Sequence, residues 1–355
     1  MARFALARPH VLVVVAPDGR GVGSVVESVL LRRGWPLARS PADADLLVVA
    51  GSPGPELAAA VEVLWAQVPA PRSHVHLATA SDLDARLDAA VRHLLAWEAQ
   101  RSDAGPADPW VGRGPDADTD RHADHEGPTS GEGHDHDDMD VAGLPMASSA
   151  PDRDGLELET LHVTLGPWLP GWPDGLVVEA SMQGDVLSDV GVRWADDAHP
   201  WTAGPQQCAL DALVRLLTLT GPAPVLQRWR ETRAAVREQR PGAAAHAARS
   251  ARRLARSRVL AWSLRGVPAP AGTDVAECLH RWCDVLSESP PPDARSPVVG
   301  PQELATTLQG AELAGARLAV ASVVVGPGHA LAHDDAGDGA AHVEPARGHH
   351  GGGHD

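Results

Sequence analysis

The chain has 355 residues and a formal net charge of −17, with eleven tryptophans, one phenylalanine, no lysine and no tyrosine. Its length predicts about two or three domains, and the lack of tyrosine excludes any mechanism that needs a phenol. Residues 103–140 carry a net charge of −10 and residues 329–355 a net charge of −4. Because the rest of the chain is close to neutral, the sequence excludes an acidic surface spread over the whole protein.

Alternating apolar and amphipathic stretches predict three strand–helix units within residues 9–98. Ser81 is the expected N-cap of the third helix, with Asp84 three residues later. Such alternation predicts a parallel sheet joined by right-handed crossovers. The expected strands span residues 11–15, 46–50 and 75–77, and the expected helices span residues 24–33, 55–67 and 81–97.

Residues 18–24 form a glycine-rich turn before the first of these helices. Glycines at a helix N-terminus can let a phosphate approach backbone N–H groups. The spacing differs from the dinucleotide-binding pattern, and a chain without lysine has no Walker motif. A plain tight turn is therefore favoured over nucleotide binding.

Two stretches of this region resemble a known family. Residues 45–51 read Asp-Leu-Leu-Val-Val-Ala-Gly, and residues 57–72 run from an apolar helix into Gln-Val-Pro-Ala-Pro-Arg. They resemble the small, cluster-bearing subunit of respiratory complex I (NADH-quinone oxidoreductase) and of nickel–iron hydrogenases. The resemblance implies a flavodoxin-like fold and a 4Fe–4S cluster held by cysteines after the first and third strands. Residues 16–18 (Ala-Pro-Asp) and 78–80 (Ala-Thr-Ala) stand there instead, so it implies the fold and a docking surface without the cluster.

Residues 101–154 and 329–355 are rich in Asp and His and lack apolar periodicity, so we expect a disordered linker and a disordered tail. Imidazole and carboxylate groups bind divalent transition metals, so weak binding of Ni or Zn is one interpretation. A solubilising tether without a metal role is the other, since the spacing suits no closed site. The candidate ligands are His122, His125, His134, His136, His329, His333, His342, His349, His350 and His354.

Residues 155–194 predict a small β-meander. Residues 156–165 alternate at period two and predict the first strand, and two more strands are expected over residues 176–182 and 186–194, separated by Gly184-Asp185. Gly166-Pro167 and Gly184-Asp185 resemble motifs of the quinone-site subunit of complex I, which is homologous to hydrogenase large subunits. That resemblance implies a quinone-headgroup Tyr and His. Leu169 stands where the family has its first His, and the paired cysteines of the nickel site are also missing.

The remaining chain predicts a helix bundle with short Pro/Gly turns. Leu210, Leu213 and Leu217 share one face of the first helix. The expected helices span residues 205–221, 223–238, 243–264, 273–287 and 301–325.

These elements predict the α/β class and four regions along the chain. A flavodoxin-like, parallel-sheet domain over residues 1–100 is followed by the linker over residues 101–154. An α+β domain of a β-meander and a helix bundle is expected over residues 155–328, and the tail over residues 329–355.

Residues 225–265 hold eleven arginines and two glutamates. The segment matches no recognised nucleic-acid-binding motif, so solvated helix faces or a dock for acidic surfaces are favoured over nucleic-acid binding. Three cysteines predict no disulfide framework and fit a reducing cytoplasm. Cys278 and Cys283 are expected to be buried structural thiols.

The apolar runs are too short for direct membrane insertion, so contact with the inner face of the membrane would come through partners.

Three functional hypotheses follow. The first is a non-catalytic scaffold or assembly factor bound to membrane and peripheral subunits of a complex I-like or hydrogenase-like assembly, without Fe–S, Ni or quinone ligands of its own. The second is an accessory protein that handles Ni or Zn. The third is a redox subunit that uses a cluster lent by a partner. The missing ligands favour a role that is not enzymatic.

Overall fold

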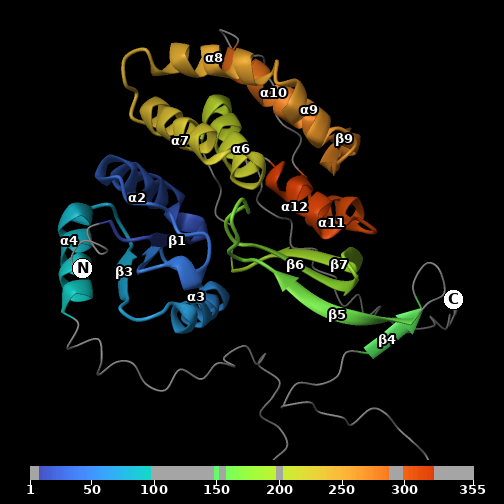
Figure 1. Cartoon of the computed structure of the whole chain (residues 1–355), viewed down its shortest axis with the longest axis horizontal. Helices are drawn as coiled ribbons and strands as arrows, with labels where there is room; N and C mark the ends of the chain where they lie inside the picture. The colour runs from blue at the N-terminus through green and yellow to red at the C-terminus, as the bar shows by residue number, and fades with distance from the viewer. Residues whose placement is uncertain (1–7, 97–147, 152–156, 197–202, 288–298, 324–355) are drawn as a thin grey trace, which may run out of the picture.

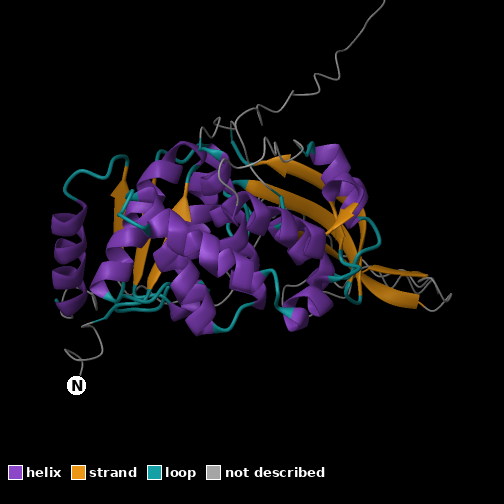
Figure 2. Cartoon of the chain, turned by 90° about the horizontal axis from the view of Figure 1, so that it is seen from above, coloured by secondary structure: helices purple, strands orange, loops and turns teal. Residues whose placement is uncertain are grey.

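The computed structural model describes residues 8–96, 148–151, 157–196, 203–287 and 299–323. These residues form a mixed α/β structure with a parallel sheet in the N-terminal half and an antiparallel sheet followed by helices in the C-terminal half (Figure 1). The two sheets lie toward opposite ends of the molecule, with helices between them (Figure 2). Among the described residues, no helix combines the length and the apolar character needed to span a bilayer.

The N-terminal half is a parallel sheet of strand order β1-β2-β3 with helices on both faces. Val11, Leu46 and Val48 face α2 and α4, whereas Leu47 and Val49 face α3. Because both faces are covered, β2 is buried along its whole length, as its unbroken apolar sequence predicts. The elements are β1 (Val11–Val15), α2 (Arg20–Arg33), β2 (Leu46–Ala50), α3 (Pro55–Gln67), β3 (Ser73–Leu77) and α4 (Leu83–Leu95).

A single parallel bridge adds a fourth position to this sheet. Val11 pairs with Leu37 through the side of β1 that does not face β2. The spatial order is therefore residue 37, β1, β2, β3. The chain passes from β1 through α2 to residue 37, toward one edge of the sheet and across one of its faces. It passes from β2 through α3 to β3, toward the other edge and across the opposite face. Both crossovers thus have the same hand, in keeping with the rule for parallel sheets.

Two local predictions in this half are wrong. The glycine-rich segment 18–24 is not a turn throughout, because α2 already begins at Arg20 after the 3-10 turn Pro17–Gly19. Gly21 and Gly23 are therefore helical. Ser81 does not cap α4: Asp82 occupies the N-cap position, in the left-handed region and without a side-chain cap hydrogen bond.

The C-terminal half begins with a four-stranded antiparallel meander of order β4-β5-β6-β7. The strands are β4 (Ser148–Pro151), β5 (Glu157–Leu165), β6 (Leu176–Gln183) and β7 (Val186–Trp194). Three of them match the prediction closely. β4 corrects the boundary of the expected linker, because residues 148–151 pair with β5. The other residues of the expected linker, 101–147 and 152–154, and the whole expected tail lie outside the described part of the chain.

Seven α-helices follow in the described residues. They are α6 (Pro205–Thr220), α7 (Ala223–Arg237), α8 (Ala243–Leu254), α9 (Arg258–Leu264), α10 (Val275–Ser287), α11 (Pro301–Leu308) and α12 (Leu313–Ala321). The two-residue strands β8 (Pro268–Ala269) and β9 (Thr273–Asp274) form a small hairpin before α10.

Two helices that the sequence predicts as continuous are each divided. The expected helix over residues 243–264 breaks at Ser257, whose hydroxyl accepts a hydrogen bond from Leu260 N and so caps α9. The expected helix over residues 301–325 breaks at Gly310, whose φ of 75° does not continue a helix. Apolar periodicity runs through both breaks, which is why it does not reveal them.

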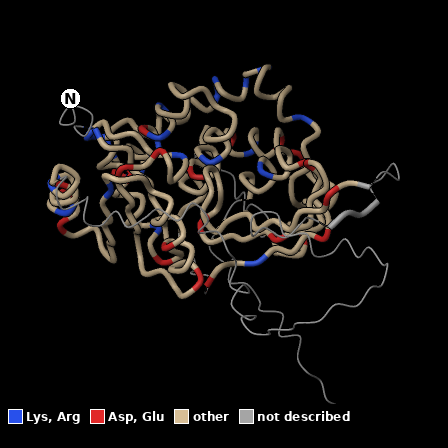
Figure 3. Tube along the Cα trace, turned by 60° about the horizontal axis from the view of Figure 1, so that its bottom comes forward, with Lys and Arg blue, Asp and Glu red and all other residues tan. Residues whose placement is uncertain are grey.

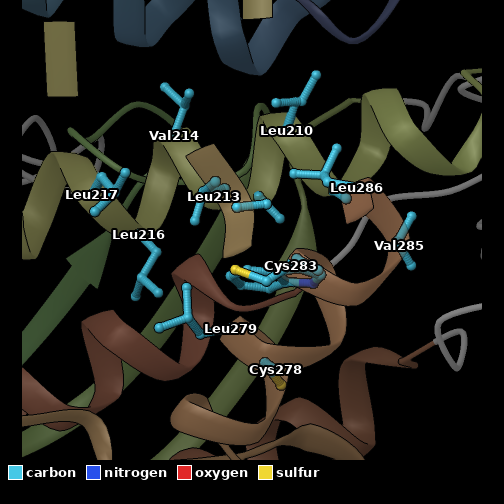
Figure 4. Close-up of a cluster of buried hydrophobic side chains, with 14 of the residues drawn as sticks. Leu210, Leu213, Val214, Leu216, Leu217, Cys278, Leu279, Cys283, Val285 and Leu286 are labelled. Atoms are coloured by element: carbon cyan, nitrogen blue, oxygen red, sulfur yellow. The ribbon is translucent and has the colours of Figure 1, made fainter. Parts of the chain in front are cut away.

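The helical core forms where α6 and α10 pack against each other. Leu210, Leu213 and Leu217 are buried there, as expected from their shared face (Figure 4). Cys278 and Cys283 are buried in the same cluster, in keeping with the prediction of structural thiols. A second cluster packs α11 and α12 onto β6 and β7.

Candidate functional site

A cavity of about 210 Å³ lies where the two halves meet. Its walls come from β1, α2, residues 37–39, the loop between β5 and β6, α6 and α7. Elements far apart in sequence therefore share this site, and α2 lies beside α7 in the fold (Figure 1).

Charged stripes of α6 and α7 line the cavity. On α7 the stripe consists of Arg230, Arg233 and Arg237, spaced three and four residues apart, which places them on one helix face. On α6 the corresponding residues are Asp211 and Arg215. The opposite face of α6 carries the buried leucines of the core, so this helix separates an apolar core from a polar cavity.

Ion pairs join the two halves across this cavity. Arg233 contacts Glu27 of α2, and it also lies 3.4 Å from the Asp211 carboxylate. Arg237 lies 3.3 Å from the same carboxylate. On another wall, Arg20 of α2 lies 3.4 Å from Asp174 in the β5–β6 loop. Basic and acidic positions meet in the middle of the molecule (Figure 3).

The cavity wall carries more positive than negative charge. Six guanidinium groups and three carboxylates line it. The arginines are Arg20, Arg39, Arg215, Arg230, Arg233 and Arg237, and the acids are Glu27, Asp174 and Asp211. With these side chains ionised, the formal excess is three positive charges.

Burial and like charge perturb several of these groups. Burial, together with the neighbouring Arg39, lowers the pKa of Arg230 to about 10. Burial, together with Arg237, lowers the pKa of Arg233 to about 9, although two carboxylates contact Arg233. Burial raises the pKa of Asp211. Perturbations of this kind are typical of functional sites and of buried ion-pair networks alike.

The ends of β1 and β2, where an α/β sheet of this order binds its ligand, are filled by the chain itself. A Cβ on Gly19 would collide with the carbonyl oxygen of Ala50. The Asp18 carboxylate accepts a hydrogen bond of 2.8 Å from Ser52 N and lies against Gly51. The backbone at this point is too closely packed to admit a cofactor without rearrangement.

The C-terminal half also contacts the sheet domain at β1 and at the start of α3. Trp168 Nε1 donates a hydrogen bond of 2.7 Å to the carbonyl oxygen of Val13. The Asp196 carboxylate accepts hydrogen bonds from Glu56 N at 3.0 Å and from Leu57 N at 3.1 Å. Asp196 therefore caps α3 from a position about 140 residues away.

None of the ten histidines that the sequence singles out for metal binding lies within the described residues, so the structure brings none of them together. Within the described ranges, no group of three or more His, Cys, Asp or Glu side chains could hold a metal ion. Cys208, Cys278 and Cys283 are buried. Burial, together with Asp284, raises the pKa of Cys283 to about 12, so this group is a thiol rather than a thiolate at neutral pH.

Sequence reasoning missed the cavity, although a signal for half of it is present. The segment 225–265 is arginine-rich, and within it the spacing of Arg230, Arg233 and Arg237 marks one stripe of a helix. Of the partners of that stripe, Asp211 lies on the preceding helix, whereas Glu27 comes from a distant region with no matching pattern.

Comparison with protein-family models, with curated proteins and with solved structures finds no match for this chain.

Proposed function

We propose that this chain is a non-catalytic interaction protein, a fused and degenerate relative of two peripheral subunits of complex I and nickel–iron hydrogenases. It would act as a scaffold or assembly factor for such a complex. The two halves of the chain resemble two subunits that pair in those complexes. They contact each other through the Arg233–Glu27 ion pair and through the Asp196 cap of α3, and this contact supports the proposal.

The strand order gives further support to the flavodoxin-like part of this proposal. With residue 37 counted as the second strand, the chain order across the sheet is 2-1-3-4. This is the beginning of the flavodoxin-like order, in which the ligand crevice lies between the first and the third strand of the chain. Because residue 37 counts as the second strand, these two strands are β1 and β2.

The observation that carries the proposal is the filling of that crevice. Gly19 packs on Ala50, and Asp18 bonds Ser52, at the site where the fold class binds its cofactors. A sheet that keeps its shape while its own backbone fills the ligand crevice is suited to presenting a surface. This supports an interaction role over the redox hypothesis.

The test is purification of the tagged full-length chain from its native host in mild detergent. We expect membrane subunits of a complex I-like or hydrogenase-like assembly to co-purify, and iron to be far below one cluster per chain. Recovery of the chain alone, at its monomer mass, would contradict the proposal. A low-temperature EPR signal of a cluster bound to this chain would instead favour the redox hypothesis.

A second candidate, handling of Ni or Zn, is supported by the sequence alone. Ten of the eighteen histidines lie in the two acidic segments between residues 122 and 136 and between residues 329 and 354. Deletion of residues 118–138 and 329–355 should abolish metal uptake and leave the thermal unfolding of the fold unchanged. Equal metal content of the deleted and full-length chains by elemental analysis would end this candidate.

A further inference from the structure

We propose that the cavity between α2, α6 and α7 binds a small oxyanion that carries two negative charges, such as a phosphate group or a short dicarboxylate. This ligand is independent of the scaffold role proposed above, and the two proposals can fail separately.

The first argument is the charge of the cavity wall. All three carboxylates that line it contact arginines, and three guanidinium groups still remain in excess. Arg230 has no hydrogen-bond or ion-pair partner among the residues that the structure describes. Arg39, whose charge acts on Arg230, donates to the carbonyl oxygen of Thr218 at 2.9 Å rather than to a carboxylate. These two neighbouring cations therefore lack a counter-charge in the described part of the chain.

The second argument is a buried donor. Arg215 donates from Nη2 to the carbonyl oxygen of Val323, but its Nε is buried and has no hydrogen-bond partner in the described ranges. A buried polar group is normally hydrogen-bonded, and this atom has almost no surface open to the cavity. The Arg215 side chain lines the cavity, so a dianion bound there would interact with its guanidinium mainly through its charge.

The third argument is size. The cavity has a volume of about 210 Å³. It is below the range of about 300–1,000 Å³ that is typical of sites for larger ligands. The planar guanidinium fork suits carboxylate and phosphate oxygens. Charge, donor type and volume together favour a compact dianion over a nucleotide or an extended apolar molecule.

The lowered pKa values of Arg230 and Arg233 agree with this assignment. A buried guanidinium next to another cation resists holding its proton, and an anion between them relieves that repulsion. Binding should therefore weaken when one of these positive charges is removed.

The test is isothermal titration calorimetry of the full chain with inorganic phosphate and, separately, with succinate, at constant ionic strength set by chloride. We expect saturable one-to-one binding of at least one of them. Phosphate alone would assign a phosphoryl ligand, succinate alone a dicarboxylate, and both a site that recognises charge. Absence of saturable binding of either anion at millimolar concentration would overturn the proposal.

Substitutions at Arg230 make the test specific. Arg230→Gln should weaken binding by about tenfold, the scale of one charge-assisted hydrogen bond, whereas Arg230→Lys should keep part of the affinity. Since Arg230 has no partner among the described residues, Arg230→Gln should fold normally, as circular dichroism would check. The matched control is Arg249→Gln on α8, which is exposed and outside the cavity. Equal loss of affinity in the control would show non-specific attraction and contradict the assignment.

Discussion

Arg233 of α7 and Glu27 of α2 form an ion pair although 206 residues separate them along the chain. The Arg233 side chain is only 10% exposed. Its second contact, to Asp211 of α6, links the pair to the helix that also supports the apolar core. This arrangement joins the parallel-sheet half to the helical half at a buried and charged point.

Breaking the Arg233–Glu27 pair should destabilise the fold. Glu27→Gln removes one of the two carboxylates that offset the buried charge of Arg233. We expect the free energy of unfolding to fall by about 2–3 kcal/mol. This is at the low end for buried pairs because Glu27 is partly exposed. Urea unfolding followed by circular dichroism measures it. Arg249→Gln, an exposed change, should stay within about 0.5 kcal/mol. Equal stability of the two variants would show that the pair contributes nothing.

The Asp196 cap of α3 gives a second prediction. Asp196→Ala removes the acceptor for Glu56 N and Leu57 N, and the loss of such a cap costs about 1 kcal/mol. Asp196→Asn, which keeps one acceptor oxygen, should be milder. Gly54→Ala should cost at least as much as Asp196→Ala, because its Cβ would collide with the Asp196 carboxyl group. Thermal unfolding of the three variants checks this order.

Thiol reactivity follows from burial. Cys283 is 1% exposed and burial, with Asp284, raises its pKa to about 12, so little of the reactive thiolate exists at pH 8. Burial also raises the pKa of Cys208. Native protein at pH 8 should react slowly with Ellman's reagent at all three cysteines and rapidly after denaturation. Fast native labelling of Cys283, located by peptide mass spectrometry, would contradict the packing described.

Core packing of α6 against α10 gives a fourth prediction. Leu213 is fully buried, and Leu213→Ala should cost about 2–5 kcal/mol through lost apolar contacts and the resulting cavity. Val259 of α9 is 78% exposed, so Val259→Ala should have almost no effect. The free energies of unfolding in urea compare the two. A small loss for Leu213→Ala would mean that this cluster is not the main core of the helical half.

Local patterns account for most of the elements. The unbroken apolar run of β2 and the alternation in β5 give strands at nearly the predicted residues, and Pro55 begins α3 as expected. The division at Ser257 was not predicted, because a hydroxyl cap inside an amphipathic stretch does not interrupt its apolar period.

The sequence by itself determined the three strand–helix units of the N-terminal half, three strands of the meander, the burial of the leucine face of α6 and the lack of cysteine before residue 208. Those properties depend on residue type and on spacing within one element. Only the tertiary structure decided that Glu27 meets Arg233, that Asp196 caps α3, and that arginines from several elements line one cavity. Such contacts depend on how helices far apart in the chain pack together, and a side chain carries no local mark of a partner about 200 residues away.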